Sequence, residues 1–172
     1  MLGKKMEKMM NKQVNREFYA AYLYLSMAAY FDTLNLSGFA QWMRTQTQEE
    51  VVHAMKIFDY IQERGGKVIL EAIEKPSAKL SSPLAAFEAA YEHEQKVTGW
   101  INELVDAARE EKDHASVIFL QWYVTEQVEE EQSVDAIVNH LKMVGDSPHA
   151  LLMIDRELGK RAFNAPASGS QV

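Results

Sequence analysis

The sequence predicts an all-α protein: a four-helix bundle with a long crossover between its second and third helices and a short fifth helix. Three observations support this fold class. Four long stretches carry apolar residues at helical spacing, residues typical of helix ends bound each stretch, and one proline-containing stretch without helical period separates the second from the third. The length of 172 residues suggests one domain, which we place at residues 1–163.

The first two helices are predicted to lie antiparallel. The first extends from about Lys4 to Thr33, with apolar side chains three or four residues apart. The short turn at residues 34–36 favours an antiparallel return. We expect Ser37 to cap the second helix and Gly65-Gly66 to end it, because serine is a preferred N-cap and glycine a preferred C-terminal residue.

The crossover is predicted at about residues 67–82, where Pro76 lies in a stretch without helical period. Its sixteen or so residues can span on the order of 50 Å when extended. A helix of about 28 residues is only about 42 Å long. The crossover can therefore run the full length of the bundle, so that the third helix begins parallel to the second.

The last three helices follow from their end signals. Ser82-Pro83 predicts an N-cap followed by proline at the first helical position, and Lys112-Asp113 predicts a tight turn into a fourth helix that ends at Gly145. Ser147-Pro148 begins a short apolar helix to about Lys160. This helix either contacts another subunit or packs over one end of its own bundle, and the sequence favours neither. Residues 164–172 are expected to be a disordered tail.

Composition excludes several function classes. The chain has no cysteine, which excludes disulfides, iron–sulfur clusters and cysteine-bound metals, and indicates a cytoplasmic protein. A net charge of −7 argues against nucleic acid as the main partner and is compatible with cations. No signal peptide or membrane span is expected, because no apolar run follows the N-terminal lysines and the longest uncharged run, residues 18–31, is shorter than the roughly 20 residues that a span needs.

Each long helix carries a carboxylate where its apolar stripe should continue. The interruptions are Glu17 in the first helix, Glu50 with His53 in the second, Glu94 in the third, and Glu126, Gln127 and Glu130 in the fourth. A glutamate three residues before a histidine is common by chance and is a weak signal alone. All these interruptions, however, lie about twelve to sixteen residues from their helix starts. Packing of the helices would therefore bring them to one level of the bundle.

Such a layer predicts a metal site. Burying an ionised carboxylate costs several kcal/mol unless something pairs with it, and clustered carboxylates also repel one another. Oxygen ligands with an imidazole suit Fe, Mn or Zn rather than copper. Lone glutamates on two helices with Glu-x-x-His on the others are typical of di-iron bundles. Here Gln127-x-x-Glu130 replaces one Glu-x-x-His, so one metal position should hold an imidazole and the other only oxygen.

Other polar and aromatic residues are interpreted more simply. We expect Glu131 and Glu110-Glu111 to lie on solvated faces, and Glu92 and His93 to face solvent. Tyr24, two turns from Glu17 on the same face, is expected to supply electrons or hydrogen bonds to the site, whereas Trp122 is expected to pack. A metal-free interaction bundle is the alternative, in which the buried glutamates are paired core residues.

The sequence resembles a haem-free prokaryotic ferritin from about Glu7 to Phe163. The residues that carry this resemblance are those at 15–17, 21–25, 48–54, 91–94 and 119–131. The resemblance implies a ferritin-like fold and a ferroxidase centre. Its ligands would be Glu17, Glu50 and His53 for a first iron, with Glu50 bridging to a second iron held by Glu94 and Glu130, and with Gln127 close by.

The resemblance also implies a third iron site, formed by Glu49, Glu126, Glu129 and Glu130. The expected function is iron storage: Fe(II) is oxidised with O₂ or H₂O₂, and ferric mineral is kept inside a hollow homo-oligomeric shell of 24 subunits whose four-fold contacts the fifth helix would line. The alternatives are a shell-forming iron-binding protein and a fixed di-iron protein, both with little storage turnover.

Three related groups of proteins fit less well. Haem-bearing relatives carry methionine after the second-helix glutamate, where this chain has Val51, so no haem is expected. Peroxide-reducing relatives with a rubredoxin domain need cysteines, which are absent. The small DNA-protecting relatives bind metal through histidines on the first helix, and the predicted first helix has none.

Overall fold

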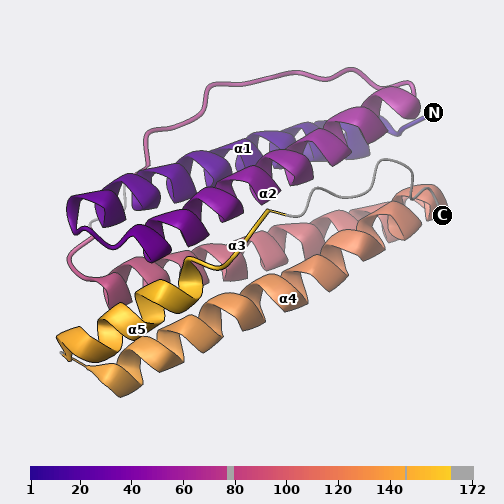
Figure 1. The fold of residues 1–172 in the computed structure, drawn as a ribbon. Coiled ribbons are helices and arrows are strands. Elements are labelled where there is room, and N and C mark those ends of the chain that lie inside the picture. The colour runs from indigo at the N-terminus through magenta and orange to yellow at the C-terminus, as the bar shows by residue number, and fades with distance from the viewer. Residues whose placement is uncertain (77–79, 146, 164–172) are drawn as a thin grey trace.

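The computed structural model describes residues 1–76, 80–145 and 147–163, and within these ranges the chain forms α-helices and no strand. The helices are α1 (Lys4–Thr33), α2 (Ser37–Glu63), α3 (Pro83–Glu110), α4 (His114–Val144) and α5 (Pro148–Leu158). Figure 1 shows the four long helices side by side, with α5 at one end. The predicted fold class is confirmed. The tail predicted at 164–172 lies outside the described residues.

The topology follows the predicted order. α2 returns antiparallel to α1, the crossover runs back along the bundle, and α3 begins parallel to α2 before α4 returns (Figure 1). α1 packs mainly against α2 and α3 mainly against α4, while α1 also contacts α3. None of the helices in the described ranges has a stretch long and apolar enough to cross a membrane.

The crossover is attached to α1 by two asparagines. Asn11 donates from Nδ2 to the carbonyl oxygen of Lys67 at 2.9 Å and accepts from the backbone N–H of Ile69 at 2.6 Å. One turn along α1, Asn15 donates to the carbonyl oxygen of Ala72 at 3.2 Å. These side chains form hydrogen bonds with backbone N–H and carbonyl groups of an extended segment that has no sheet partner. The hydrogen bonds attach the segment to the bundle.

Most helix-end predictions are confirmed, but the one for α2 is wrong. The Ser82 side chain caps α3 by accepting from the Ala85 N–H at 3.0 Å. Ser37, in contrast, is the first residue of α2, and no side-chain cap comes from the residue before it. Asp155 of α5 takes that role, accepting from the N–H groups of Gly38 at 2.8 Å and Phe39 at 3.1 Å. Local spacing could not indicate a cap that comes from another helix.

α5 packs over one end of its own bundle. Leu151, Ile154 and Leu158 pack against the apolar cluster between the long helices, whereas Leu152 and Met153 are exposed. The contact with its own bundle is therefore observed, and the contact of the exposed side with another subunit stays a prediction. The helix ends at Leu158, two residues before the predicted end.

A polar layer divides the core into two apolar clusters. The cluster nearer α5 holds Phe31, Phe39 and Phe87, whose rings contact one another. The other cluster includes Ile57 and Leu120, and Trp122 packs against it as predicted. Along every long helix, the predicted carboxylates fall between residues of these two clusters. Burial of the carboxylates alone would destabilise the folded bundle, and burial of the two apolar clusters on either side of the layer offsets this cost.

The close approach of α5 to α2 gives a prediction about stability. A Cβ added at Gly38 would lie 1.6 Å from the carbonyl oxygen of Asp155. We expect Gly38→Ala to lower the free energy of unfolding by about 2–3 kcal/mol through overpacking, measured by urea denaturation. Gly99→Ala is the matched control: nothing lies within 4 Å of its added Cβ, and the variant should gain about 0.5–1 kcal/mol. An unchanged Gly38→Ala midpoint would contradict this packing of α5.

Candidate metal centre

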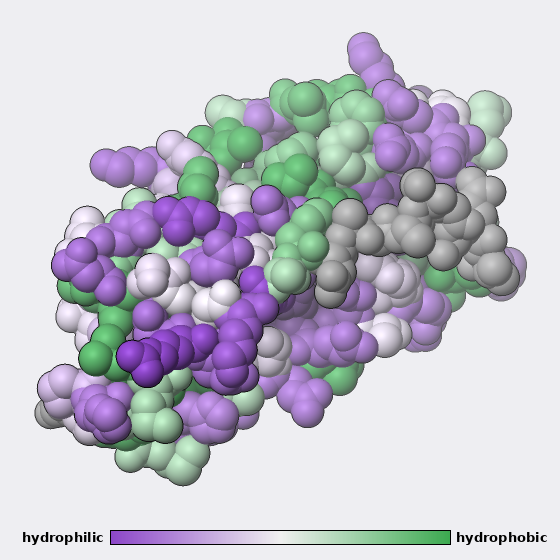
Figure 2. All heavy atoms as spheres, viewed as in Figure 1, coloured by the Kyte–Doolittle hydropathy of each residue, from purple (hydrophilic) through white to green (hydrophobic). Residues whose placement is uncertain are grey.

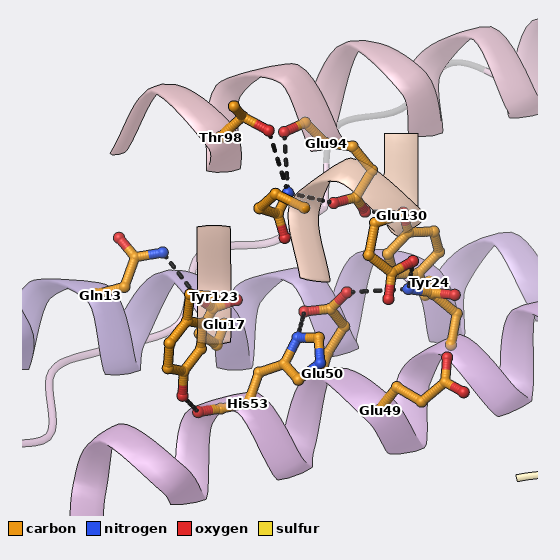
Figure 3. A network of polar contacts seen from close by, with 12 residues as sticks. Gln13, Glu17, Tyr24, Glu49, Glu50, His53, Glu94, Thr98, Tyr123 and Glu130 are labelled. Carbon is orange, nitrogen blue, oxygen red and sulfur yellow. Dashed lines mark hydrogen bonds and ion pairs between the residues drawn. The ribbon is translucent and has the colours of Figure 1, made fainter. Parts of the chain in front are cut away.

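Five predicted ligands meet in the polar layer. Each exposes at most 6% of its surface, and together they come from all four long helices: Glu17 from α1, Glu50 and His53 from α2, Glu94 from α3, and Glu130 from α4. Figure 3 shows their side chains directed toward one another between the helices. The sequence prediction that these side chains reach one level of the bundle is therefore confirmed.

Glu17, Glu50 and His53 form the tightest group. Their ligand atoms all lie within 4.8 Å of one another, and His53 Nδ1 lies 3.4 Å from Glu50 Oε2. Glu17 Oε2 is buried and has no hydrogen-bond partner in the described part of the chain. A buried carboxylate oxygen without a donor is costly, so a cation between these three side chains fits the observed arrangement.

Two glutamines hold the carboxylates in place. Gln13 donates from Nε2 to Glu17 Oε1 at 2.8 Å, and Gln46 donates from Nε2 to Glu50 Oε1 at 3.2 Å and to Glu130 Oε2 at 2.8 Å (Figure 3). Neither glutamine was predicted to contact the centre. A signal was present, because each lies four residues before its glutamate and hence one helical turn away on the same face.

Glu94 has its own set of partners. The Tyr24 hydroxyl donates to Glu94 Oε1, and Gln127 donates from Nε2 to Glu94 Oε2 at 3.2 Å. Tyr24 and Gln127 thus both contact the candidate centre, as predicted. Gln127 also lies 3.4 Å from the hydroxyl oxygen of Thr98, which donates in turn to Glu131. Glu131, expected on a solvated face, is therefore partly buried and bonded to a neighbouring helix.

Aromatic rings fix the orientation of His53. Trp122 lies edge-on to the imidazole with 5.4 Å between ring centroids, and Tyr123 lies at 6.1 Å. The Tyr123 hydroxyl donates to the backbone oxygen of His53 at 2.7 Å. No contact of Tyr123 with the site was predicted from the sequence. Its contacts hold α2 and α4 together beside the candidate ligands.

Burial controls the charge of the layer. It raises the pKa of Glu17 to about 8, with the nearby charge of Glu50 adding to the effect, and it raises the pKa of Glu94 to about 8 in the same way. The pKa values of Glu50 and Glu130 are also raised, first by burial and then by neighbouring carboxylates. Without a cation, the four glutamates therefore tend to keep protons near neutral pH; a divalent cation would favour their ionised forms.

The three outer carboxylates, those of Glu49, Glu126 and Glu129, are more exposed than the inner ligands. Glu49 and Glu126 are partly buried and Glu129 is exposed. Within the described ranges, the side chains that bring one ligand atom each to within 4.8 Å of the others are Glu17, Glu50 and His53, and none of the outer carboxylates belongs to this group. Glu49 instead forms an ion pair with Arg161, a residue that sequence reasoning missed. The third iron site remains a prediction.

The expectation that His93 faces solvent is wrong. His93 exposes only 6% of its surface and lies among the rings of Tyr19, Tyr24 and Trp100. Burial lowers its pKa to about 4, so the imidazole is neutral near pH 7. Glu92 is exposed as expected. The error arose because the periodicity of one helix does not show which neighbouring helix covers its flank.

Comparisons with known proteins agree with one another. The family model described as a ferritin-like domain matches residues 7–144. Bacterial non-heme ferritins of Staphylococcus aureus and Staphylococcus epidermidis are each 39% identical over 164 residues, which is 95% of this chain and 99% of theirs. Two solved structures, an open-pore ferritin of the hyperthermophilic archaeon Archaeoglobus fulgidus and an engineered closed form of it, are each 55% identical. Their TM-scores are 0.93 and 0.94, and the matches cover 94% and 95% of this chain and all of each solved chain.

The raised pKa values predict how stability depends on pH. The inner glutamates bind more protons when folded than when unfolded, so the metal-free protein should lose stability as pH rises from 6.5 to 8. His93 has a lowered pKa, and its contribution is already complete above pH 6.5. The measurement is urea denaturation in chelator at several pH values.

A Glu17→Gln/Glu94→Gln variant serves as the control and should show a flatter pH dependence, because two of the proton-binding groups are gone. Saturating Zn(II) should remove or reverse the slope of the unmodified protein, because the metal binds the ionised carboxylates. A metal-free stability that rises between pH 6.5 and 8, equally in both proteins, would contradict this account of the layer.

Proposed function

Because the chain belongs to the ferritin family, whose function is iron storage, we propose that it oxidises Fe(II) to Fe(III) at the layer of buried glutamates. The ferric iron is then stored. Two Fe(II) ions each give one electron to the oxidant. O₂ with two protons then becomes H₂O₂, or H₂O₂ with two protons becomes two waters. Fe(II) is here a substrate, which enters, is oxidised and leaves as ferric ion.

The observation that carries this proposal is the ligand group with its unpaired oxygen. Glu17, Glu50 and His53 present ligand atoms within 4.8 Å of one another, and Glu17 Oε2 lacks a donor in the described structure. Carboxylate oxygens with one imidazole suit iron, and the carboxylates stabilise Fe(III) more than Fe(II) because attraction to hard oxygen ligands grows with the charge of the metal. The layer therefore favours oxidation as well as binding.

The two irons would have unequal ligands. Glu17, Glu50 and His53 would hold the first iron, and Glu94 and Glu130 the second. Glu50 is the proposed bridge, and its link to Glu130 through the Gln46 amide supports that role. The second position offers only oxygen ligands and should bind more weakly, which would allow the ferric product to leave.

Tyr24 and Gln127 would act beside the second iron. Burial and neighbouring glutamates raise the pKa of Tyr24 well above its usual value, so its hydroxyl keeps its proton and can donate to Glu94. Its hydrogen bond places the phenol beside the proposed second iron, where it orients Glu94, and both electrons of the step come from the two irons. Gln127 keeps Glu94 oriented through its amide. A third iron held by Glu49, Glu126, Glu129 and Glu130 would lie beside this pair.

Storage requires an enclosed space, and we propose a hollow shell of 24 copies in the cytoplasm, without haem. An exposed apolar surface supports assembly: Tyr22 and Leu25 of α1 and Val51 of α2 each expose 40–50% of their surface, next to Ile73 of the crossover. Figure 2 shows apolar residues along the upper edge of the molecule, where Figure 1 places the crossover. Such a contiguous patch is typical of a surface covered by another subunit.

The test of this function is anaerobic loading with Fe(II) followed by O₂, with ferric absorbance as the readout. We expect fast oxidation of two irons per chain and then continued uptake far beyond that ratio. Glu94→Ala should slow the fast phase by about 10- to 100-fold, because it removes a ligand of the second iron. Glu92→Ala, an exposed neighbour on α3, is the matched control and should oxidise iron normally.

Two outcomes would contradict the proposal. If two irons are oxidised and then held, the protein carries a fixed di-iron group and the proposed storage turnover is wrong. If neither protein oxidises Fe(II) faster than buffer, the layer is not a ferroxidase centre.

A further inference from the structure

Arg161 reaches from the C-terminal segment to the middle of α2. It lies three residues beyond the end of α5, on the segment that Figure 1 draws in yellow running from α5 toward mid-bundle. Its guanidinium forms an ion pair with Glu49 and donates from Nη1 to Gln46 Oε1 at 2.8 Å. The same group lies 4.4 Å from the ring centroid of Trp42. Three contacts on one helix therefore hold this segment.

These contacts connect Arg161 to the candidate centre at two points. Gln46, which accepts from the guanidinium, donates at its other end to both Glu50 and Glu130. Glu49 is the neighbour of Glu50 in the chain and stands apart from the inner group in Figure 3. The guanidinium thus contacts Glu49 directly, and the side-chain amide of Gln46 connects it to the inner carboxylates of Glu50 and Glu130. Both Arg161 and Glu49 keep 24% of their side-chain surface exposed, so ions can reach the pair.

We propose that Arg161 is a built-in counter-cation for Glu49, which a metal ion must displace in order to bind this outer carboxylate. This inference rests on the proposed function, since it concerns the third iron. A carboxylate oxygen that accepts guanidinium N–H groups has less electron density to offer a metal, and the positive charge of Arg161 repels an arriving cation. In the metal-free protein the same charge offsets the repulsion between Glu49 and the inner glutamates.

The displacement has two consequences. The outer position should fill only after the two inner positions, because Glu49 is paired with a guanidinium, whereas the partners of the inner glutamates in the described ranges are amides, a phenol and an imidazole. A metal on Glu49 should also release the segment at residues 160–163 from Trp42, since the ion pair is one of its attachments. Binding of the third ion and attachment of the segment therefore weaken each other by the same factor.

The first test is calorimetric titration of the assembled, metal-free protein with Zn(II), which binds without redox chemistry. The unmodified protein should bind two ions tightly and a third more weakly. Arg161→Gln should tighten the third ion by about tenfold and leave the first two almost unchanged, because a charge-assisted contact no longer competes. Arg161→Lys keeps the charge and should stay nearer to the unmodified protein. Arg156→Gln removes the same charge from an exposed position on α5 and is the control.

The second test reads the segment itself through Trp42. In a Trp100→Phe/Trp122→Phe background, Trp42 is the one remaining tryptophan of the three, so its emission reports the guanidinium beside it. Phenylalanine at 122 keeps an aromatic ring beside His53, and calorimetry of this background must show the same first two Zn(II) sites as the unmodified protein. We expect no change over the first two equivalents of Zn(II) and a change with the third. With Arg161→Gln added, the emission should start near that final value and stay there.

The outcomes separate this inference from the function on which it rests. A third ion of equal affinity in the unmodified protein and Arg161→Gln, or no third ion in either protein, would overturn the inference and leave the ferroxidase centre standing. The same holds if Trp42 responds to the first two ions or does not respond at all. If the inner glutamates bind no Zn(II) in either protein, both the inference and the proposed function fail.

Discussion

The structure depends on keeping four carboxylates in the interior of a helix bundle. Each long helix contributes one, and the helices pack so that all four reach the same level between two apolar clusters. Their mutual repulsion and lost hydration would oppose folding if all four were ionised. In the metal-free chain, raised pKa values reduce that charge, and a bound divalent cation would replace the protons. Stability and metal binding are thus two aspects of one electrostatic constraint.

The surrounding residues fix the orientation of the four carboxylates without neutralising their charge. Gln13, Gln46 and Gln127 donate neutral N–H groups to the glutamates, which orients the carboxylates and leaves their charge available to a metal. The charged partner, Arg161, lies outside the inner group on Glu49. The inner carboxylates accept from neutral amides, whereas Glu49 is paired with a guanidinium. This difference would explain why the inner positions bind iron first. The apolar clusters on either side supply the rigidity that such positioning needs.

The sequence was sufficient to predict the parts of the fold that depend on periodicity. The five helices, the crossover and the common level of Glu17, Glu50 and Glu94 follow from spacing along single helices. The failures concern contacts between elements distant in sequence. The cap of α2 comes from Asp155, and His93 is covered by rings of α1 as well as its own helix. No local pattern contains that information, whereas the glutamines four residues before Glu17 and Glu50 were a usable signal.

The most direct test of the account is to locate metal in crystals of the protein soaked with Fe(II) under anaerobic conditions, using anomalous scattering at the iron edge. We expect two neighbouring peaks in the polar layer, one among Glu17, Glu50 and His53 and the other between Glu50 and the carboxylates of Glu94 and Glu130. Iron bound only at surface carboxylates, with the inner layer empty, would contradict this expectation. The buried glutamates would then be protonated core residues, and the layer would have no role in oxidising iron.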